Sequence, residues 1–352
     1  MSLFIIVFCV FGLRLEAQTQ YRVRTIAFYN VENLFDTKND SLIFDDDRTP
    51  EGKDNWTIGR YEKKITNIAK VLSEVGSVLT KTSPDIIGLC EIENKWVVED
   101  LIQHKTLNDK NYGIIHFDSP DERGIDVAFL YKKSAFIPDS FKSHRLLIFD
   151  DEGFRDYSRD QLVVGGFLDN EKIVFIINHW PSRSGGEARS RPNRLAAAKL
   201  NSRIIDSIKK LNVDSKIISM GDFNDDPIDD SFKKVLKTKG KVKNVSEGSP
   251  FNPMEKLFRK GIGSLAYRDK WNLFDQIFFT SNLINDKKEG YGFWTAAVFN
   301  PTYLLDPMGR YKGYPLRTYA GGSYIGGYSD HFPVYMYLIR ESQRLNTTEL
   351  PN

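Results

Sequence analysis

Short apolar segments alternate along the chain with amphipathic stretches and polar turns. The apolar segments are rich in β-branched and aromatic residues and are bounded by turn residues, a pattern that predicts strands. The predicted strands cover Arg24–Tyr29, Ile86–Cys90, Asp126–Tyr131, Leu162–Leu168, Ile173–Ile177, Lys216–Met220, Phe274–Thr280 and Pro333–Leu338. Apolar side chains at helical spacing predict a helix over Ile58–Leu79, and a second helix is expected over Arg191–Lys209, with Pro192 near its start. This alternation predicts an α/β protein with a mixed sheet and helices packed outside it.

Two long segments, Thr37–Asn55 and Tyr291–Gly327, are polar or glycine-rich, and we expect functional loops there rather than domain boundaries. No proline- or serine-rich linker divides the chain. Its 352 residues are compatible with one large domain or two ordinary ones. Hydrophobic residues make up 41% and charged residues 27% of the chain, close to soluble globular usage, so a sizeable core is expected.

The N-terminus carries an almost unbroken apolar run, Leu3 to Leu13, followed by the small residue Ala17. A run of this length matches the apolar region of a signal peptide and is too short to span a bilayer. We expect residues 1–17 to be a signal peptide and the protein to be secreted or periplasmic, with no stable membrane insertion after cleavage. No lysine or arginine precedes the run, so a buried strand or an uncleaved anchor stays as the alternative.

Composition excludes two classes of protein. The chain has 49 Lys and Arg against 47 Asp and Glu, a net charge of +2, which excludes binding of nucleic acid through bulk positive charge. A local basic groove remains compatible with this balance. The two cysteines, Cys9 and Cys90, cannot form a disulfide framework or a cysteine-based zinc site.

Polar clusters recur where the predicted strands end. They are Asn30-Val31-Glu32-Asn33, Glu91, Asn178-His179-Trp180-Pro181, Gly221-Asp222-Phe223-Asn224 and Ser329-Asp330-His331. Each cluster by itself is explained by a turn or a helix cap, but their joint occurrence is not. Oxygen ligands of this kind suit a hard cation such as Mg²⁺, and histidine exchanges protons near neutral pH. Together they equip a site for phosphodiester hydrolysis. Nucleophile-elbow, P-loop and dinucleotide-binding motifs are absent from the sequence.

In this order, the motifs resemble the endonuclease/exonuclease/phosphatase superfamily. They are Tyr29-Asn30-Val31-Glu32, Gly88-Leu89-Cys90-Glu91, Asn178-His179-Trp180-Pro181, Gly221-Asp222-Phe223-Asn224, Asp275-Gln276-Ile277 and Ser329-Asp330-His331-Phe332-Pro333. The resemblance covers about residues 22–340 as one domain and leaves 341–352 as a C-terminal tail. It implies a four-layer αββα sandwich, in which two mixed sheets face each other between outer helices.

The resemblance also implies a role for each matching residue. It implies that Glu91 is the principal metal ligand and that Asn30, Glu32 and Asp330 also belong to the metal site. It implies that Asp222 and Asn224 orient the attacking water, and that His331 is the base, oriented by Asp275. His179 would be a second histidine, which contacts the phosphate or the leaving group. The implied cofactor is Mg²⁺, with Mn²⁺ or Ca²⁺ as alternatives. An acidic partner for His179 cannot be assigned; Asp126 is a candidate, with a surface turn as the alternative.

Aromatic and basic residues near these motifs indicate what the site binds. Trp180 is a candidate to stack on a base, and Arg183, Arg189 and Arg317 are candidates to contact phosphate. The alternative is a packed tryptophan beside solvated arginines. We expect the segment from Tyr311 to Gly327 to form one wall of the cleft.

Three hypotheses follow for the function. The first is a monomeric, secreted, metal-dependent nuclease that cleaves DNA or RNA. The second, on the same fold, is a phosphodiesterase or phosphatase acting on a lipid headgroup or an inositol phosphate. A long exposed apolar hairpin for membrane contact would favour the second, and none is apparent in the sequence. The third is a non-catalytic binding protein, but each expected catalytic position is filled.

Overall fold

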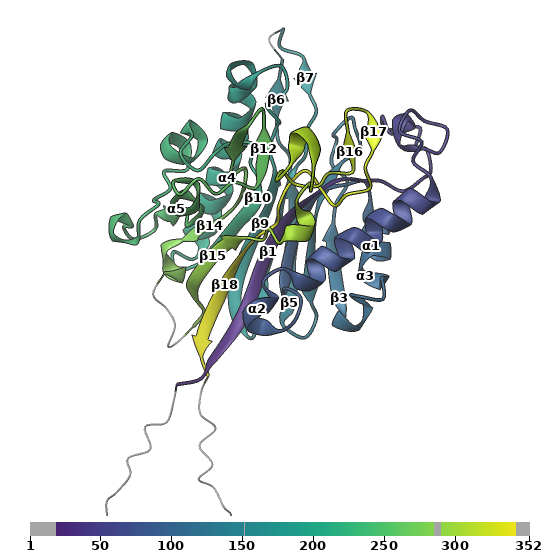
Figure 1. Cartoon of the computed structure of the whole chain (residues 1–352). Coiled ribbons are helices and arrows are strands. Elements are labelled where there is room, and N and C mark those ends of the chain that lie inside the picture. Colours follow the sequence, from purple (N-terminus) through teal and green to yellow (C-terminus); the bar gives the residue numbers. More distant parts are fainter. Residues whose placement is uncertain (1–18, 151, 285–289, 343–352) are drawn as a thin grey trace, which may run out of the picture.

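Two six-stranded mixed sheets form the centre of the molecule (Figure 1). The computed structural model describes residues 19–150, 152–284 and 290–342. The first sheet has the order β15 (Gly292–Val298), β18 (Val334–Glu341), β1 (Tyr21–Leu34), β2 (Ile86–Ile92), β4 (Asp126–Lys132), β3 (Tyr112–His116). The second has the order β11 (Pro250–Phe251), β14 (Asp275–Thr280), β10 (Lys216–Asp222), β9 (Glu171–His179), β8 (Gln161–Leu168), β5 (Phe136–His144).

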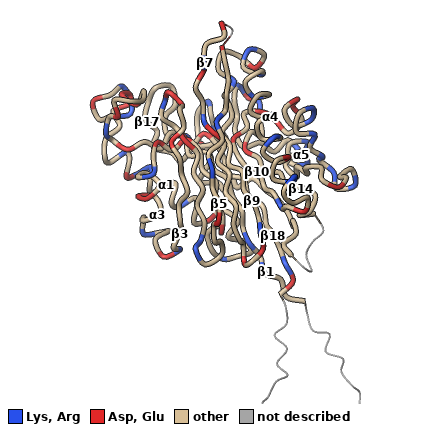
Figure 2. The backbone as a smooth tube through the Cα atoms, turned by 180° about the vertical axis from the view of Figure 1, so that it is seen from behind, with Lys and Arg blue, Asp and Glu red and all other residues tan. Residues whose placement is uncertain are grey.

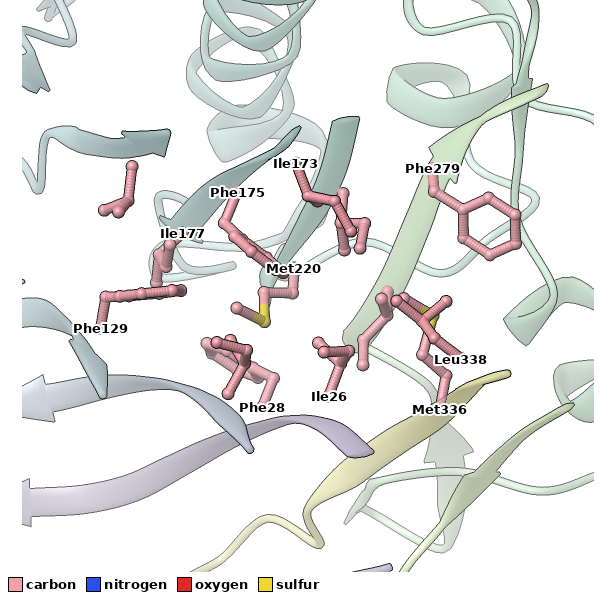
Figure 3. Packing of buried hydrophobic residues seen from close by; sticks show 14 of the residues in the cluster. Ile26, Phe28, Phe129, Ile173, Phe175, Ile177, Met220, Phe279, Met336 and Leu338 are labelled. Carbon is pink, nitrogen blue, oxygen red and sulfur yellow. The ribbon is translucent and has the colours of Figure 1, made fainter. Parts of the chain in front are cut away.

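Alternation along the strands creates three separate apolar layers. In β9, Phe175 and Ile177 face the first sheet, whereas Val174 and Ile176 face the opposite side. Figure 3 shows the layer between the sheets, where Phe175 and Ile177 lie close to Phe129 of β4. Both faces of each sheet are therefore covered, which gives four layers.

Helices close the two outer faces (Figure 1). The first sheet is covered by α1 (Ile58–Glu74) and α3 (Lys95–Gln103), and α2 (Ser77–Thr80) follows α1. The second sheet is covered by α4 (Glu187–Leu211), and α5 (Met254–Phe258) contacts β14 and β15. The αββα sandwich implied by the resemblance is confirmed. In the described part of the chain, no helix is long and apolar enough to cross a membrane.

Most of the predicted elements are present, with shifted ends. The first predicted helix ends earlier, because Gly76 adopts a left-handed conformation between α1 and α2. The second begins at Glu187, so Pro192 lies inside α4. The expectation of a loop over Tyr291–Gly327 is wrong in its first part, since β15 pairs there with β18. The predicted signal peptide and nearly all of the predicted tail lie outside the described residues.

Three two-stranded hairpins gather at one end of the sandwich, at the top of Figure 1. They are β6 (Ile148–Phe149) with β7 (Arg155–Asp156), β12 (Leu265–Tyr267) with β13 (Lys270–Asn272), and β16 (Tyr319–Ala320) with β17 (Ser323–Tyr324). Lys and Arg are interspersed with Asp and Glu along the backbone (Figure 2). Any recognition of an anionic substrate must therefore come from a local arrangement at this end.

Candidate active site

The polar clusters at the strand ends meet at one edge of the sandwich. β1 pairs with β2 in parallel and β9 pairs with β10 in parallel, so their carboxyl ends lie together. The register places His179 opposite Asp222, and Asp222 opposite Asp275. Residues separated by more than forty positions in the sequence thus stand on neighbouring strands.

Irregular backbone at the end of β1 and β2 aims the acidic side chains. Glu32, Asn33 and Glu91 have positive φ angles of 52°, 53° and 59°, and the register of the strand pair shifts here. Such irregularity turns a side chain away from the regular alternation. The Glu91 carboxylate accepts hydrogen bonds from the backbone N–H of Asn33 at 3.0 Å and from Nδ2 of Asn30 at 3.2 Å.

Asn30 joins the two sheets at the centre of the site. Its side chain is fully buried, and Nδ2 donates to Oε1 of Glu91 and, at 3.0 Å, to Oδ2 of Asp222. Its Oδ1 accepts from the backbone N–H of Glu32 at 2.9 Å. One amide therefore positions a carboxylate from each sheet, and Asn30 lies beside the predicted metal ligand.

His331 and Asp275 form a hydrogen-bonded pair. Nδ1 of His331 lies 2.6 Å from Oδ2 of Asp275, and Nε2 lies 3.9 Å from Oδ2 of Asp222 and 3.9 Å from Oδ1 of Asp330. Burial lowers the pKa of His331, but the neighbouring carboxylates of Asp275 and Asp222 outweigh it and raise the pKa well above its usual range. These carboxylates therefore favour the protonated form of the imidazole.

Asp222 is buried near another carboxylate, an environment that disfavours its charged form. Burial raises its pKa to about 7, although His331 acts against this shift. Its Oδ1 accepts from the backbone N–H of Asn224 at 3.0 Å, and the side chain of Asn224 donates to the carbonyl of Trp180 at 3.0 Å. Asn224 thus orients Asp222, and Asp222 is poised to exchange a proton near neutral pH.

His179 reaches the same point from the second sheet. Its Nε2 lies 3.8 Å from both Glu91 and Asp222, and within the described part of the chain its buried Nδ1 has no hydrogen-bond partner. Burial, with Arg159 and Arg123 nearby, lowers the pKa of His179 well below its usual range. The candidate partner Asp126 is wrong, because its carboxylate lies 3.0 Å from Nε2 of His116 instead.

Two basic side chains, Lys64 and Arg317, neutralise Glu32 and Asp330. Lys64 was not predicted as a site residue, and Arg317 was expected to contact substrate. Lys64 of α1, 1% exposed, lies 3.7 Å from Glu32 and donates to Oγ1 of Thr318 at 2.6 Å. Arg317 pairs with Asp330 and lies 3.6 Å from Glu32. Arg317, expected to contact substrate, is therefore engaged with the acids of the site. Lys64 lies one turn before Ile68 on the apolar stripe of its helix, a pattern that predicts a buried lysine.

The donor set fits a divalent cation at Glu91. Among the described residues, the Glu91 carboxylate forms no ion pair with a lysine or arginine and lies beside the carboxylate of Asp222 and the amide of Asn30. Oxygen donors of this kind suit a hard cation. Glu32 and Asp330, also expected to bind metal, are compensated by Lys64 and Arg317. Burial raises the pKa of the Cys90 thiol well above its usual value, so a thiolate mechanism has no support here.

Trp180 does not stack on a substrate base. Its side chain is 1% exposed, packs against Phe223 and Phe232, and donates from Nε1 to Oδ1 of Asn178 at 3.1 Å. The alternation of β9 explains this position, because His179 faces the site and the next residue faces α4. The alternative reading, a packed tryptophan, is correct.

The predicted arginines of the following loop differ from one another. Arg183 pairs with Asp225 and Asp229 and donates to the carbonyl of Asn224, so it holds the loop rather than a phosphate. Arg189, in the first turn of α4, lines a cavity of about 550 Å³. The β6–β7 hairpin and Arg159 line the same cavity, which lies beside Pro181.

The β6–β7 hairpin carries exposed apolar side chains. Phe149 and Phe154 are exposed, the latter 66%, and Leu147 just before β6 is also exposed. The strands have only two residues each, so this is not the long apolar hairpin that would favour membrane contact. The signal in the sequence is the apolar run from Leu146 to Phe149, which is only four residues long and is followed by acidic residues.

A histidine and aspartate pair, a second histidine and a carboxylate cluster define a phosphoesterase site. The sequence profile of the endonuclease/exonuclease/phosphatase family matches residues 25–340, so the chain belongs to this family. It is accordingly a phosphodiester or phosphate hydrolase that depends on a divalent metal ion.

Several solved structures share the fold. An endonuclease/exonuclease/phosphatase family protein of Bacteroides thetaiotaomicron is 18% identical, with a TM-score of 0.55 over 94% of this chain and 100% of that one. A mannosyl-6-phosphatase of the same species is 18% identical, with a TM-score of 0.52 over 90% and 99%. TDP2 of D. rerio, complexed with a single-strand DNA product, is 15% identical, with a TM-score of 0.51 over 90% and 98%. The curated proteins contain no match.

Proposed function

We propose that the protein is a Mg²⁺-dependent nuclease that hydrolyses DNA or RNA phosphodiester bonds. The observation that carries the proposal is the convergence of His331, Asp222 and His179 beside Glu91. Asp222 is able to accept a proton, and the imidazoles of His331 and His179 are able to donate hydrogen bonds at the same place. The complex of TDP2 with single-strand DNA gives a structural neighbour that holds nucleic acid on the same fold.

In the proposed reaction, water attacks phosphorus opposite the leaving oxygen. Asp222, whose pKa is raised to about 7, accepts the proton as the new P–O bond forms. His331 and His179 donate hydrogen bonds to the oxygens that gain negative charge, and the leaving oxygen takes the proton of protonated His331 as its P–O bond breaks. Glu91, with Asn30, would hold the divalent cation, which supplies positive charge beside the phosphate when bound. The resemblance implies His331 as the base; in the reaction proposed here His331 donates a proton and Asp222 accepts one.

The first test is cleavage of supercoiled plasmid. The purified protein is incubated with plasmid alone, with EDTA, and with EDTA followed by Mg²⁺, alongside His331→Ala. His104→Ala, at the C-cap of α3, is the matched control histidine. Nicking that requires Mg²⁺, is lost in His331→Ala and persists in His104→Ala would support the proposal. Intact plasmid in all reactions would reject it.

A lipid headgroup phosphodiesterase is the second candidate, because of the exposed apolar side chains of the β6–β7 hairpin. Phosphorylcholine release from sphingomyelin or phosphatidylcholine vesicles, without plasmid cleavage, would favour it. Phosphate release from sugar and inositol phosphates belongs in the same series, because a phosphatase shares the fold.

We also propose export of the protein, on the apolar run Leu3 to Leu13 and the small residue Ala17. Expression of the full chain and mass spectrometry of the product test this proposal. A mature chain beginning at Gln18 in the periplasm or medium is expected. An uncleaved chain in the cytoplasm would reject it.

A further inference from the structure

A pocket of about 330 Å³ opens beside the catalytic centre on the His331 side. Arg317 and Asp330 form the end of the pocket nearest the catalytic residues, and Tyr267, Tyr311, Tyr314 and Ile325 form its walls. The walls come from the β12–β13 hairpin, from the segment that precedes Arg317 and, at Ile325, from the residue that follows β17. Oδ1 of Asp330 lies 3.9 Å from Nε2 of His331, so a ligand in this pocket would lie on the His331 side of the catalytic centre.

A row of aromatic rings connects the pocket with the catalytic segment. The ring centroids of Tyr311 and Tyr314 are 5.9 Å apart, those of Tyr314 and Trp271 are 5.9 Å apart, and those of Trp271 and Phe332 are 6.0 Å apart with nearly parallel planes. Phe332 directly follows His331, and its backbone N–H donates to the carbonyl of Ser264. The pocket wall and the catalytic histidine thus belong to one packed unit.

A second set of contacts fixes the opposite wall. The turn of the β12–β13 hairpin has positive φ angles at Arg268 and Asp269. The hydroxyl of Tyr314 accepts from the backbone N–H of Asp269 at 2.7 Å and donates to its carboxylate at 2.5 Å. These bonds attach the hairpin to the segment before Arg317. The pocket is preorganised, which reduces the entropy lost when a ligand binds.

The chemistry of the walls indicates a planar ligand. The Tyr267 and Tyr311 side chains are partly exposed, 62% and 39%, at the edge of a catalytic site. The Arg268 guanidinium lies 5.2 Å from the Tyr267 ring centroid, and the Arg310 guanidinium lies 5.8 Å from that of Tyr311. Aromatic faces stack on nucleobases, and arginine attracts the flanking phosphates. The volume is at the lower end of that of small-molecule sites, which corresponds to one nucleotide rather than a longer segment.

We infer that this pocket is a nucleobase subsite, which holds the base next to the scissile phosphate by stacking on Tyr311 or Tyr267. The inference rests on the proposed nuclease function and adds the element of the substrate that the protein recognises. It predicts that the enzyme acts better on phosphodiesters that carry a base on that side than on those that lack one.

The test compares protein and substrate changes together. Tyr311→Ala, Tyr267→Ala and Tyr311→Phe are assayed on an oligonucleotide with one cleavable phosphodiester, its other linkages being methylphosphonates. Two analogues lack the base on the 5′ or the 3′ side of that bond. Phe167→Ala is the control. Phe167 is 39% exposed, as is Tyr311, and it lies at the end of β8 that is far from the active site.

Loss of the stack should raise KM for the intact substrate about tenfold in Tyr311→Ala or Tyr267→Ala, with kcat nearly unchanged. On one of the two base-free analogues, the same variant and the wild type should have equal KM. Tyr311→Phe and Phe167→Ala should resemble the wild type on each substrate. Equal effects of the alanine variants on all three substrates, or no effect, would overturn the subsite while leaving the nuclease intact. Wild-type protein that cleaves none of these substrates would overturn the proposed function and the subsite with it.

Discussion

The two histidines of the site come from different sheets and have opposite electrostatic environments. His331, just before β18 of the first sheet, faces Asp275, Asp222 and Asp330. His179, at the end of β9 in the second sheet, lies near Arg159 and has no partner for Nδ1 within the described chain. Both are buried, and burial lowers the pKa of each. The charges around them therefore decide the outcome, which is a raised pKa for His331 and a lowered pKa for His179.

Because of this difference, His331 and His179 have different chemical roles. A cationic imidazole attracts the phosphate but has no free lone pair for a proton from water. A neutral imidazole can donate from one nitrogen only, and which nitrogen carries the proton is set by its neighbours. Nε2 of His179 faces Glu91 and Asp222, so the tautomer with the proton on Nε2 is favoured there. Substitution of each histidine by itself distinguishes these two roles.

Removal of His331 should have the largest effect. His331→Ala takes away the cation that faces Asp222 and the phosphate, and we expect kcat/KM to fall by about 10² to 10⁴-fold. Steady-state kinetics on plasmid or oligonucleotide measures this loss, with circular dichroism to confirm folding. His104→Ala should retain full activity. Near-wild-type turnover of folded His331→Ala would remove His331 from the mechanism.

His179→Ala should have the next largest effect, about 10² to 10³-fold in kcat, the range for loss of one preorganised donor. Because burial and the nearby arginines lower the pKa of His179 and so favour its neutral form, the shape of the pH profile should not change in His179→Gln. Profiles of kcat from pH 5 to 9 for wild type and variant provide the comparison. A limb that disappears in His179→Gln would show that His179 titrates during the reaction.

Asp275→Asn should have a smaller effect at neutral pH and a distinct effect at alkaline pH. The raised pKa of His331 means that its cation is present below that pKa and is lost as the pH rises through it. Without the Asp275 carboxylate the pKa of His331 falls, so the alkaline decline in activity should begin at lower pH. We expect a roughly tenfold or larger loss of kcat on the alkaline side of the profile and a smaller loss on its acid side. An unshifted alkaline limb would contradict a cationic role for His331.

The sequence was sufficient for the layers and for the catalytic cluster. The apolar strands alternate between two buried faces, and the polar residues at their ends are forced to one edge by parallel pairing. It was insufficient where a side chain's direction depends on a distant element. Asp126 pairs with His116 of a neighbouring strand, β3, that was not predicted, and β15 was hidden in a long segment with polar and small residues. Lys64 and Glu32 meet only because α1 packs over the end of β1.

The ion pairs of Arg317 were likewise not predictable from the sequence. Arg317 was expected to contact substrate because the guanidinium group suits phosphate, yet its partners Glu32 and Asp330 lie on β1 and just before β18. Spacing along the chain contains no information on which of several acids an arginine selects. The three-dimensional proximity of two acids decides it, because their mutual repulsion is relieved by one cation.

Trp180→Phe should have the smallest effect on activity and separates the core role of this residue from a substrate role. The phenyl ring keeps contacts with Phe223 and Phe232 but loses the hydrogen bond from Nε1 to Asn178. We expect the free energy of unfolding to fall by about 0.5 to 1.5 kcal/mol, because one buried hydrogen bond is lost while Asn201 still donates to Oδ1 of Asn178. Urea denaturation measures this loss. The KM for oligonucleotide should stay within about twofold of wild type, whereas a stacked base would make it rise roughly tenfold or more. A large rise in KM with unchanged stability would show that Trp180 reaches the substrate after all, and that the direction assigned by strand alternation next to His179 is wrong.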